Sequence, residues 1–394
     1  MAFDYVLLGK KLQEARESLL IDAVEAAERL QISVEDYLSV ESGQKKATGD
    51  QVVLLASLYQ RDFRYFVTGD YPSAESQIQE MFRLNASLSQ NDRIAIQEFV
   101  RLCEYEHFLE REVFQKKSSS IPDYSQHRFG HNNFKWQGAE AAALERTRLD
   151  LGQLAIIDIF ELMRKQGIHV FKRQLEDGNI SALYINHPTA GHCILVNYIE
   201  DLYRQNFSAA HEYCHALFDS VRKQEVTYLK SNLSEEIKKI EARASSFAGI
   251  FLVPRECIEK DYSPRTDYED WIYTIRQIAK RFRVNYQVVI IRLQELGWIT
   301  ENLKKQLWNE KRLVIKFNEK FDPEIPPDLS PGQKERLTQI IRQGLSLHFI
   351  DLSTEAYRRG EITYHKLLEM LLLPLDQGCQ LLNDFRTFLQ VTEL

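Results

Sequence analysis

The pattern that limits the fold of this chain most strongly is His211-Glu212-Tyr213-Cys214-His215, within the segment FSAAHEYCHALFD. Residues four apart share one face of an α-helix, so a helix here would point both imidazoles at a single ion. Glu212 would lie about 100° round the helix from His211, within reach of a water molecule at that ion. The flanking residues are mostly apolar, and buried imidazoles without a partner would be costly. The sequence therefore predicts a helix whose two histidines bind a metal.

A third protein ligand is expected, because catalytic zinc sites usually combine three side chains with one open position. Glu241, in the segment IKKIEARASSFAGIFLVP, could supply it. Ala244, Ser245 and Ala248 follow it on the same stripe of a predicted helix, and small residues there would let that helix approach its neighbour closely. We predict Glu241 as the third ligand; the alternative is a glutamate on an exposed helix surface.

The chemistry expected of His211, His215 and Glu241 around a divalent ion is hydrolysis. Zinc in such a site lowers the pKa of water to about 7. Glu212 would take the proton of the attacking water and pass it to the departing amine of a peptide bond. Two imidazoles and one carboxylate also suit manganese, so Zn²⁺ is favoured and Mn²⁺ stays open.

Other residues that could belong to a site have simpler interpretations. Cys214 lies between the two histidines but off their face, which predicts a buried packing residue. His187 and His192 flank a predicted loop where a group that stabilises an oxyanion could lie, but we interpret both as solvated histidines. The five cysteines have no paired spacing, which argues against a disulfide framework and a thiolate zinc site: Cys103, Cys193, Cys214, Cys257 and Cys379.

Length and charge exclude some classes of protein. The 394 residues exceed one compact core, so two to four domains are expected. A formal net charge of -7 gives no general attraction to nucleic acid. The N-terminus lacks the pattern of a signal peptide, and the apolar run from Leu371 to Leu375 is too short to span a bilayer. We expect a cytoplasmic protein with no membrane contact.

The segment from Trp136 to Trp298 resembles the ImmA/IrrE-type metallopeptidases. The resemblance rests on five motifs that occur in this order: QGAEAAALERTRLDLG, GIHVFKR, CILVN, RQNFSAAHEYCHALFD and EARASSFAGIFLVP. The family often has Gly where this chain has Cys214 and Asn where it has Ser245, but neither position is a ligand.

This resemblance implies a role for each candidate site residue. His211 and His215 correspond to the metal-binding histidines, Glu212 to the catalytic glutamate and Glu241 to the third ligand. It also implies cleavage of a specific protein partner, typically a helix-turn-helix repressor or an antitoxin, in stress, phage or mobile-element control.

The first 70 residues resemble the Xre-type helix-turn-helix domain of phage repressors, through LGKKLQEARE, EAAERLQIS and the helix end at Glu41-Ser42-Gly43. Glu35 and Asp36 occupy the would-be recognition helix, where acidic groups weaken contact with phosphates. Duplex DNA and a purely protein-docking role therefore both stay open for residues 1–70. Nearby basic residues could partly compensate: Lys10, Lys11, Arg16, Lys45 and Lys46.

The expected fold is mostly α-helical, with an α+β zincin-like peptidase domain whose helices pack on one face of a small sheet. IHVFKR, ISALYI and HCILVNYI are the predicted strands, and LVIKF near Val314 is a further candidate. Four regions are expected: a helix-turn-helix domain at 1–70, a helical segment and linker at 71–136, the metallopeptidase domain at 137–262 and a helical C-terminal region at 263–394.

The preferred interpretation is a regulatory zinc endopeptidase. The alternative is a DNA-binding transcriptional regulator that uses the peptidase fold as a sensor or interaction module. The intact His-Glu-His pattern with Glu241 favours the enzyme, whereas a basic recognition helix, which would favour the regulator, is missing.

Overall fold

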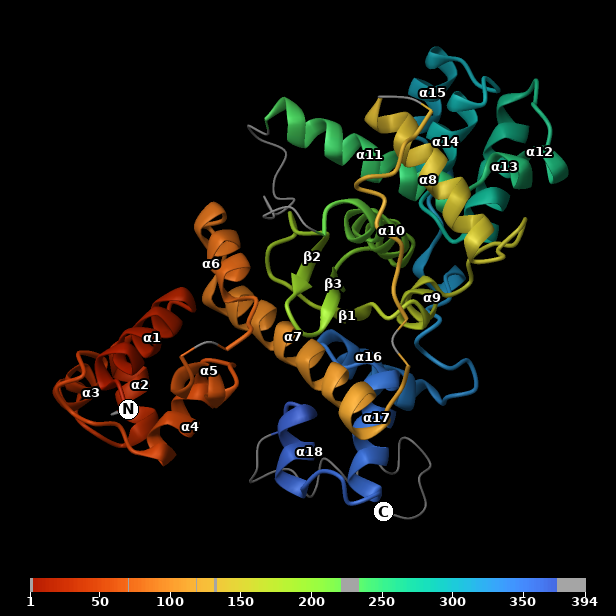
Figure 1. Ribbon diagram of the computed structural model, residues 1–394. Helices are drawn as coiled ribbons and strands as arrows, with labels where there is room; N and C mark the ends of the chain where they lie inside the picture. The colour runs from red at the N-terminus through yellow and green to blue at the C-terminus, as the bar shows by residue number, and fades with distance from the viewer. Residues whose placement is uncertain (1–2, 70, 118, 131–132, 221–233, 374–394) are drawn as a thin grey trace.

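The computed structural model describes residues 3–69, 71–117, 119–130, 133–220 and 234–373. These residues are mostly helical and include one three-stranded sheet (Figure 1), which confirms the predicted combination of helices with a small α+β region. Among the described helices, none is both long and apolar enough to cross a membrane.

Five short helices form a bundle at the N-terminal end, and only three residues separate the second from the third. Asp22 and Ser33 cap α2 and α3 by accepting backbone N–H bonds, which is why these short helices begin where they do. A Cβ atom on Gly9 would fall 2.1 Å from the carbonyl oxygen of Glu41, so glycine lets α1 lie directly against the end of α3. The helices are α1 (Tyr5–Ser18), α2 (Ala23–Leu30), α3 (Val34–Glu41), α4 (Gly49–Leu58) and α5 (Phe63–Val67).

Two helices lead from this bundle towards the sheet: α6 (Glu75–Leu84) and α7 (Gln90–Phe108). A π-helical turn, η1 (Leu109–Val113), extends α7. Glu75 at the start of α6 pairs with Arg61, with 2.6 Å between Oε1 and a guanidinium nitrogen. This buried pair fixes the connection between the bundle and α6.

The sheet has the strand order β1-β3-β2, with β3 parallel to β1 and antiparallel to β2. The bounds are β1 (His169–Arg173), β2 (Ala182–His187) and β3 (Gly191–Asn197), at the three predicted places. Ile194 is the register partner of Val170 on β1 and of Tyr184 on β2. The parallel pair needs a long crossover, whereas β2 and β3 are joined by a short turn.

Four helices pack beside the sheet: α8 (Phe134–Arg148), α9 (Ile159–Lys165), α10 (Leu202–Phe218) and α11 (Glu235–Leu252). Two of them, α9 and α10, contact its strands, and the other two form a layer on α10. α10 contacts β2 and β3, and α11 lies against both α10 and α8. A Cβ atom on Gly138 of α8 would fall 2.3 Å from the carbonyl oxygen of Arg243, so glycine allows α8 and α11 to approach closely.

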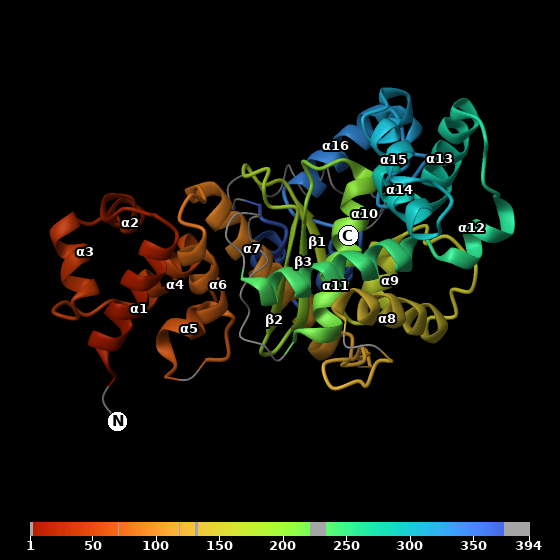
Figure 2. The same cartoon turned by 90° about the horizontal axis from the view of Figure 1, so that it is seen from above.

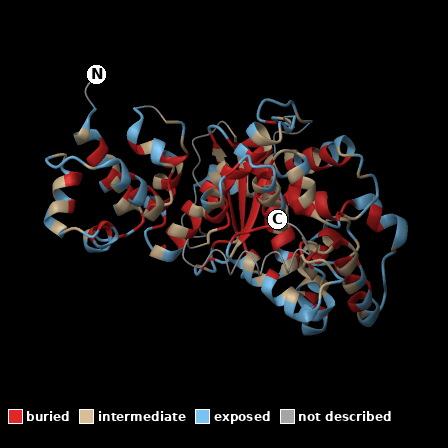
Figure 3. Cartoon of the chain, turned by 90° about the horizontal axis from the view of Figure 1, so that it is seen from below, coloured by how far each residue is buried: buried red, intermediate tan, exposed pale blue. Residues whose placement is uncertain are grey.

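Both faces of the sheet are buried, so the prediction of helices on only one face is wrong. Phe171 and Leu195 point into the core that includes α7, whereas Val170 and Ile194 point into the core that includes α10. Figure 2 shows α7 on one side of the strands and α10 with α11 on the other, and Figure 3 shows the strands mostly buried. The strands carry apolar side chains on both faces, such as Phe171 on one face and Val170 on the other, so each face needs a cover.

The C-terminal part of the described chain is helical, as predicted. LVIKF is not a strand, because it lies between two 3₁₀ turns, η2 (Lys311–Leu313) and η3 (Phe317–Glu319). The end of the predicted helical region, residues 374–394 with Cys379, lies outside the described residues. The helices are α12 (Arg255–Asp261), α13 (Tyr268–Phe282), α14 (Tyr286–Glu295), α15 (Glu301–Trp308), α16 (Pro331–Arg342), α17 (Leu347–Arg358) and α18 (Tyr364–Met370).

A buried ion cluster ties this C-terminal part to the sheet. Lys172 of β1 is almost completely buried and lies 3.0 Å from Asp322 Oδ1 and 3.1 Å from Glu324 Oε2. Arg164 of α9 also pairs with Glu324. Because removing one partner would leave an uncompensated buried charge, this cluster fixes the loop before α16 against β1.

Candidate metal centre

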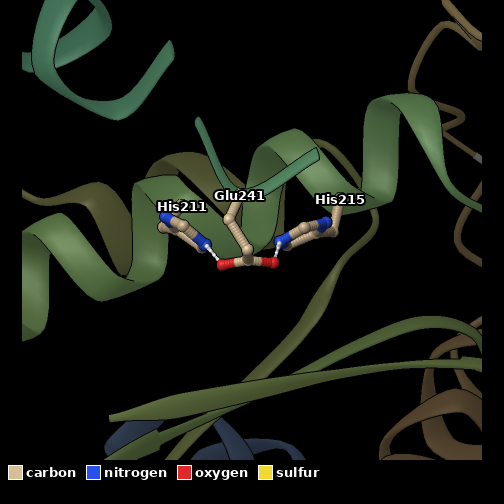
Figure 4. A group of neighbouring side chains, drawn as sticks. All are labelled: His211, His215 and Glu241. Atoms are coloured by element: carbon tan, nitrogen blue, oxygen red, sulfur yellow. Dashed lines mark hydrogen bonds and ion pairs between the residues drawn. The ribbon is translucent and has the colours of Figure 1, made fainter. Parts of the chain in front are cut away.

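The three predicted ligands lie together on two neighbouring helices. His211 and His215 project from one face of α10, and Glu241 projects from α11 between them (Figure 4). The distance from His211 Nε2 to Glu241 Oε2 is 3.1 Å, and that from His215 Nε2 to Glu241 Oε1 is 3.5 Å. One nitrogen or oxygen atom of each residue lies within 4.8 Å of the others.

Each imidazole is held from behind through its other nitrogen. His215 Nδ1 lies 2.9 Å from Asp219 Oδ2, and His211 Nδ1 lies 3.5 Å from Ser245 Oγ. Such partners fix the tautomer and orientation of histidines that bind metals. Both Nε2 atoms are therefore turned towards the space that Glu241 also faces.

Arg243 supports this arrangement from α11. One of its guanidinium nitrogens lies 2.7 Å from Asp219 Oδ1, and its guanidinium stacks 4.2 Å from the centre of the Phe218 ring. The sequence analysis missed both Asp219 and Arg243. Asp219 could have been found from its position four residues after His215, but nothing local in the sequence pairs it with Arg243.

The arrangement fits a divalent ion of the zinc or manganese type. Two imidazole nitrogens and one carboxylate form the donor set of many catalytic zinc sites. Glu241 and His211 are each partly exposed, with side-chain exposures of 20% and 14%, so the cluster is accessible from outside.

Glu212 is nearly completely buried beside this cluster. Burial raises the pKa of its carboxyl above the usual range, an effect that His215 and His211 oppose and that Glu241 and Asp219 reinforce. A carboxylate with a raised pKa accepts a proton more readily at neutral pH. Its environment therefore suits the general base predicted from the sequence.

The protonation of His215 is governed by its neighbours. Burial lowers the pKa of its imidazole, but the hydrogen bond that it donates to Asp219 and the charges of Glu212 and Glu241 raise it more, so the net shift is upward. For Asp219 the signs are reversed: burial raises the pKa of its carboxyl, but His215 and Arg243 lower it more, so the net shift is downward. Asp219 thus stays charged and holds His215 in place.

The remaining predictions near the site have mixed outcomes. Cys214 is fully buried, and burial raises the pKa of its thiol, which confirms a packing residue. The prediction of solvated histidines is wrong. His187 is buried at the end of β2, with Nε2 3.0 Å from Glu104 Oε1, and His192 of β3 is half-buried, with Nδ1 2.8 Å from the Tyr184 hydroxyl.

Helix α7 explains the error for His187. It comes from about 80 residues earlier in the chain, crosses this end of the sheet and supplies Glu104 as a partner. No pattern close to His187 in the sequence reveals that coverage.

Residues 163–294 match the family model of the IrrE N-terminal-like domain of the M78 peptidases. No curated protein matches the chain significantly. The matched region runs from α9 to α14 and includes His211, Glu212, His215 and Glu241, whereas the N-terminal bundle and α15 to α18 lie outside it. The match supports an ImmA/IrrE-type peptidase domain at residues 163–294.

Proposed function

We propose that this chain is a cytoplasmic zinc endopeptidase in which His211, His215 and Glu241 hold the ion and Glu212 is the general base. The observation that carries the proposal is the convergence of two imidazole Nε2 atoms on the carboxylate of Glu241, beside a buried glutamate on the same helix. The match of this region to a peptidase family supports the same chemistry.

The ion, Glu212 and Asp219 would each have a separate role in the reaction. A zinc ion in this position would lower the pKa of a water molecule and polarise the carbonyl of the scissile bond. Glu212 would take a proton from the attacking water and deliver it to the departing amine. Asp219 would keep His215 in one tautomer throughout, because its hydrogen bond occupies Nδ1.

We further propose that the substrate is a specific protein, a helix-turn-helix repressor or an antitoxin. The resemblance of the catalytic region to regulatory metallopeptidases supports this class of substrate, and so does the helical bundle at residues 3–69, which could dock a partner. The zinc-dependent cleavage of one partner would then be a switch in stress, phage or mobile-element control.

The proposal is tested by incubating the purified full chain with the repressor-type proteins encoded beside its gene. We expect one partner to be cut at a single site, which mass spectrometry would locate. Addition of 1,10-phenanthroline should stop the reaction, whereas its non-chelating isomer 1,7-phenanthroline should not. Cleavage that continues unchanged in the chelator would contradict a metal-dependent mechanism, and intact partners in every reaction would contradict the proposed substrate class.

A further inference from the structure

A cleft far from the metal centre lies between the N-terminal bundle and the C-terminal helix α18. Its volume is about 780 Å³, and α4, α5, α7 and α18 contribute to its walls. This is the size of sites that take small organic ligands. The apolar part of the wall includes Val53, Leu54, Phe63 and Leu373.

Three of these apolar side chains are unusually accessible. Val53, Leu54 and Phe63 are 53%, 39% and 47% exposed. Apolar residues gathered at one concave surface mark a binding site more often than single exposed ones do. An apolar body inside the cleft would cover them.

The opposite wall carries more positive than negative charge. Arg101 of α7 and Lys366 of α18 share a single carboxylate, that of Glu369, and the Lys366 Nζ lies 2.9 Å from it. Both cations also stack on the ring of Tyr105, with Lys366 Nζ 4.2 Å and the Arg101 guanidinium 5.3 Å from its centre. Arg29 adds a further cation to the lining.

The other charges at the cleft are matched. Arg61 forms a two-pronged pair with the buried Glu75, and Asp62 pairs with Arg64 at 2.8 Å. The excess charge therefore lies at Arg101, Lys366 and Arg29.

We propose that this cleft binds a small anionic ligand with an apolar body, such as an aromatic or aliphatic carboxylate, sulfonate or phosphate. The acidic group would lie at Lys366 and Arg101, and the apolar body would cover Leu54 and Phe63. The proposal does not rest on the peptidase function, because the metal centre lies on the other side of the sheet.

The charge state of Lys366 is consistent with this assignment. Burial lowers the pKa of its ammonium group, and the charge of Arg101 lowers it further, to about 8. Glu369 already pairs with both cations, and a second anion beside it would offset the charge that one carboxylate leaves unbalanced. The ligand would contact α7, and α7 also packs on β1 and β3. The helix α10, which carries the two histidines, packs on the opposite face of the same sheet.

The test uses the full chain and two probes that share one ring system. 1-Anilinonaphthalene-8-sulfonate carries an acidic group, whereas N-phenyl-1-naphthylamine lacks it. We expect saturable fluorescence enhancement with the sulfonate at one site per chain. Lys366→Met should weaken sulfonate binding about tenfold, the loss of one charge-assisted contact, and leave binding of the neutral probe unchanged.

Two matched variants separate the cleft from general surface effects. Lys304→Met removes another lysine that pairs with a glutamate three residues away, on α15, and should leave sulfonate binding unchanged. Leu54→Asp should weaken it, whereas Leu38→Asp, at a similarly exposed position outside the cleft, should not. Circular dichroism would verify the fold of each variant.

Three results would overturn the proposal: no saturable sulfonate binding to the full chain, equal affinity for the sulfonate and the neutral probe, or equal affinity of the wild type and Lys366→Met for the sulfonate.

Discussion

Glu241 is the residue of α11 whose carboxylate faces the Nε2 atoms of both histidines of α10, so the proposed metal centre depends on it. We expect about one zinc ion per chain in protein purified without added metal. Glu241→Ala should abolish this occupancy, because two imidazoles alone bind the ion weakly. Elemental analysis by plasma mass spectrometry measures it.

Glu235→Ala provides the control for that substitution. Glu235 lies on the same helix, but its side chain is 80% exposed and pairs with Lys238. Its replacement should leave the metal content unchanged. If both variants kept the ion equally well, Glu241 would not be a ligand.

Glu212 has a different role, so its replacement should separate binding from catalysis. Glu212→Gln keeps the shape of the side chain but cannot accept a proton. We expect the metal content and the thermal unfolding curve to stay close to wild type, while the rate of partner cleavage falls by about 10² to 10⁴-fold. Wild-type cleavage rates in this variant would exclude Glu212 as the base.

At the residue scale, spacing alone predicted which side chains would come together. The four-residue interval fixed a shared helix face for His211 and His215, and the small-residue stripe picked out Glu241. Asp219 and Arg243 escaped prediction because their pairing depends on how α10 crosses α11. Ser245 lay on the predicted stripe, but its hydrogen bond to His211 depends on the same crossing.

At the scale of elements, helices were predictable where a cap or a breaker marks their ends. Ser234 caps α11, and Pro254 follows its last residues, so residues in the sequence mark both ends of this helix. The burial of both faces of the sheet was harder to predict, because the helix that covers the second face, α7, comes from a distant part of the sequence. The strand prediction for LVIKF was wrong because a short apolar run with β-branched residues suits an irregular connection as well as a strand, and Val314 and Phe317 are exposed here.

The contact between α7 and β1 gives stability a specific pH dependence. His169 of β1 and Glu106 of α7 are both buried, with 2.7 Å between Nδ1 and Oε2. Burial lowers the pKa of His169, but the hydrogen bond and charge of Glu106 raise it more, to about 9. The native state thus binds this proton more tightly than the unfolded state, in which the pKa of histidine is about 6.5.

The stabilising contribution of this pair should be complete below about pH 6.5 and lost as the pH rises through about 9. The free energy of unfolding should fall by at most about 3 kcal/mol over this pH range. Urea unfolding at pH 6 and pH 9.5 measures it. The difference between the two pH values should shrink in His169→Gln and persist in His127→Gln, which changes an exposed histidine. An unchanged difference in His169→Gln would show that another group causes it.

At the scale of the whole molecule, two roles are open for the N-terminal bundle: binding of duplex DNA, as in a transcriptional regulator, or docking of a protein partner. Several of the basic residues that could have offset Glu35 and Asp36 are engaged within the bundle itself. Lys11 donates to the carbonyl oxygens of Tyr65 and Thr68, at 2.7 and 2.8 Å.

Arg16 and Lys45 are also occupied. Arg16 is paired with the buried Glu41 at 2.7 Å, and Lys45 lies 2.8 Å from Asp36. Leu38, on the same helix as Asp36, is exposed and apolar. The surface of α3 thus offers acidic and apolar groups where phosphate contact would need cations.

We therefore expect the full chain to bind duplex DNA weakly and with little sequence preference, whereas specific binding typically exceeds non-specific binding by about 10³ or more. Fluorescence anisotropy with genomic fragments at two salt concentrations measures this. Replacing Glu35 and Asp36 together by lysine should strengthen the binding and steepen its salt dependence, since each added phosphate contact releases counterions.

Tight binding of the wild type to one short palindrome at physiological salt would instead favour a transcriptional regulator. It would mean that Glu35 or Asp36 contacts the amino group of a cytosine. Weak binding that disappears with added salt would leave the acidic and apolar face of α3 as a surface for a protein partner, and the repressor or antitoxin proposed above as the substrate is the partner that we propose for it.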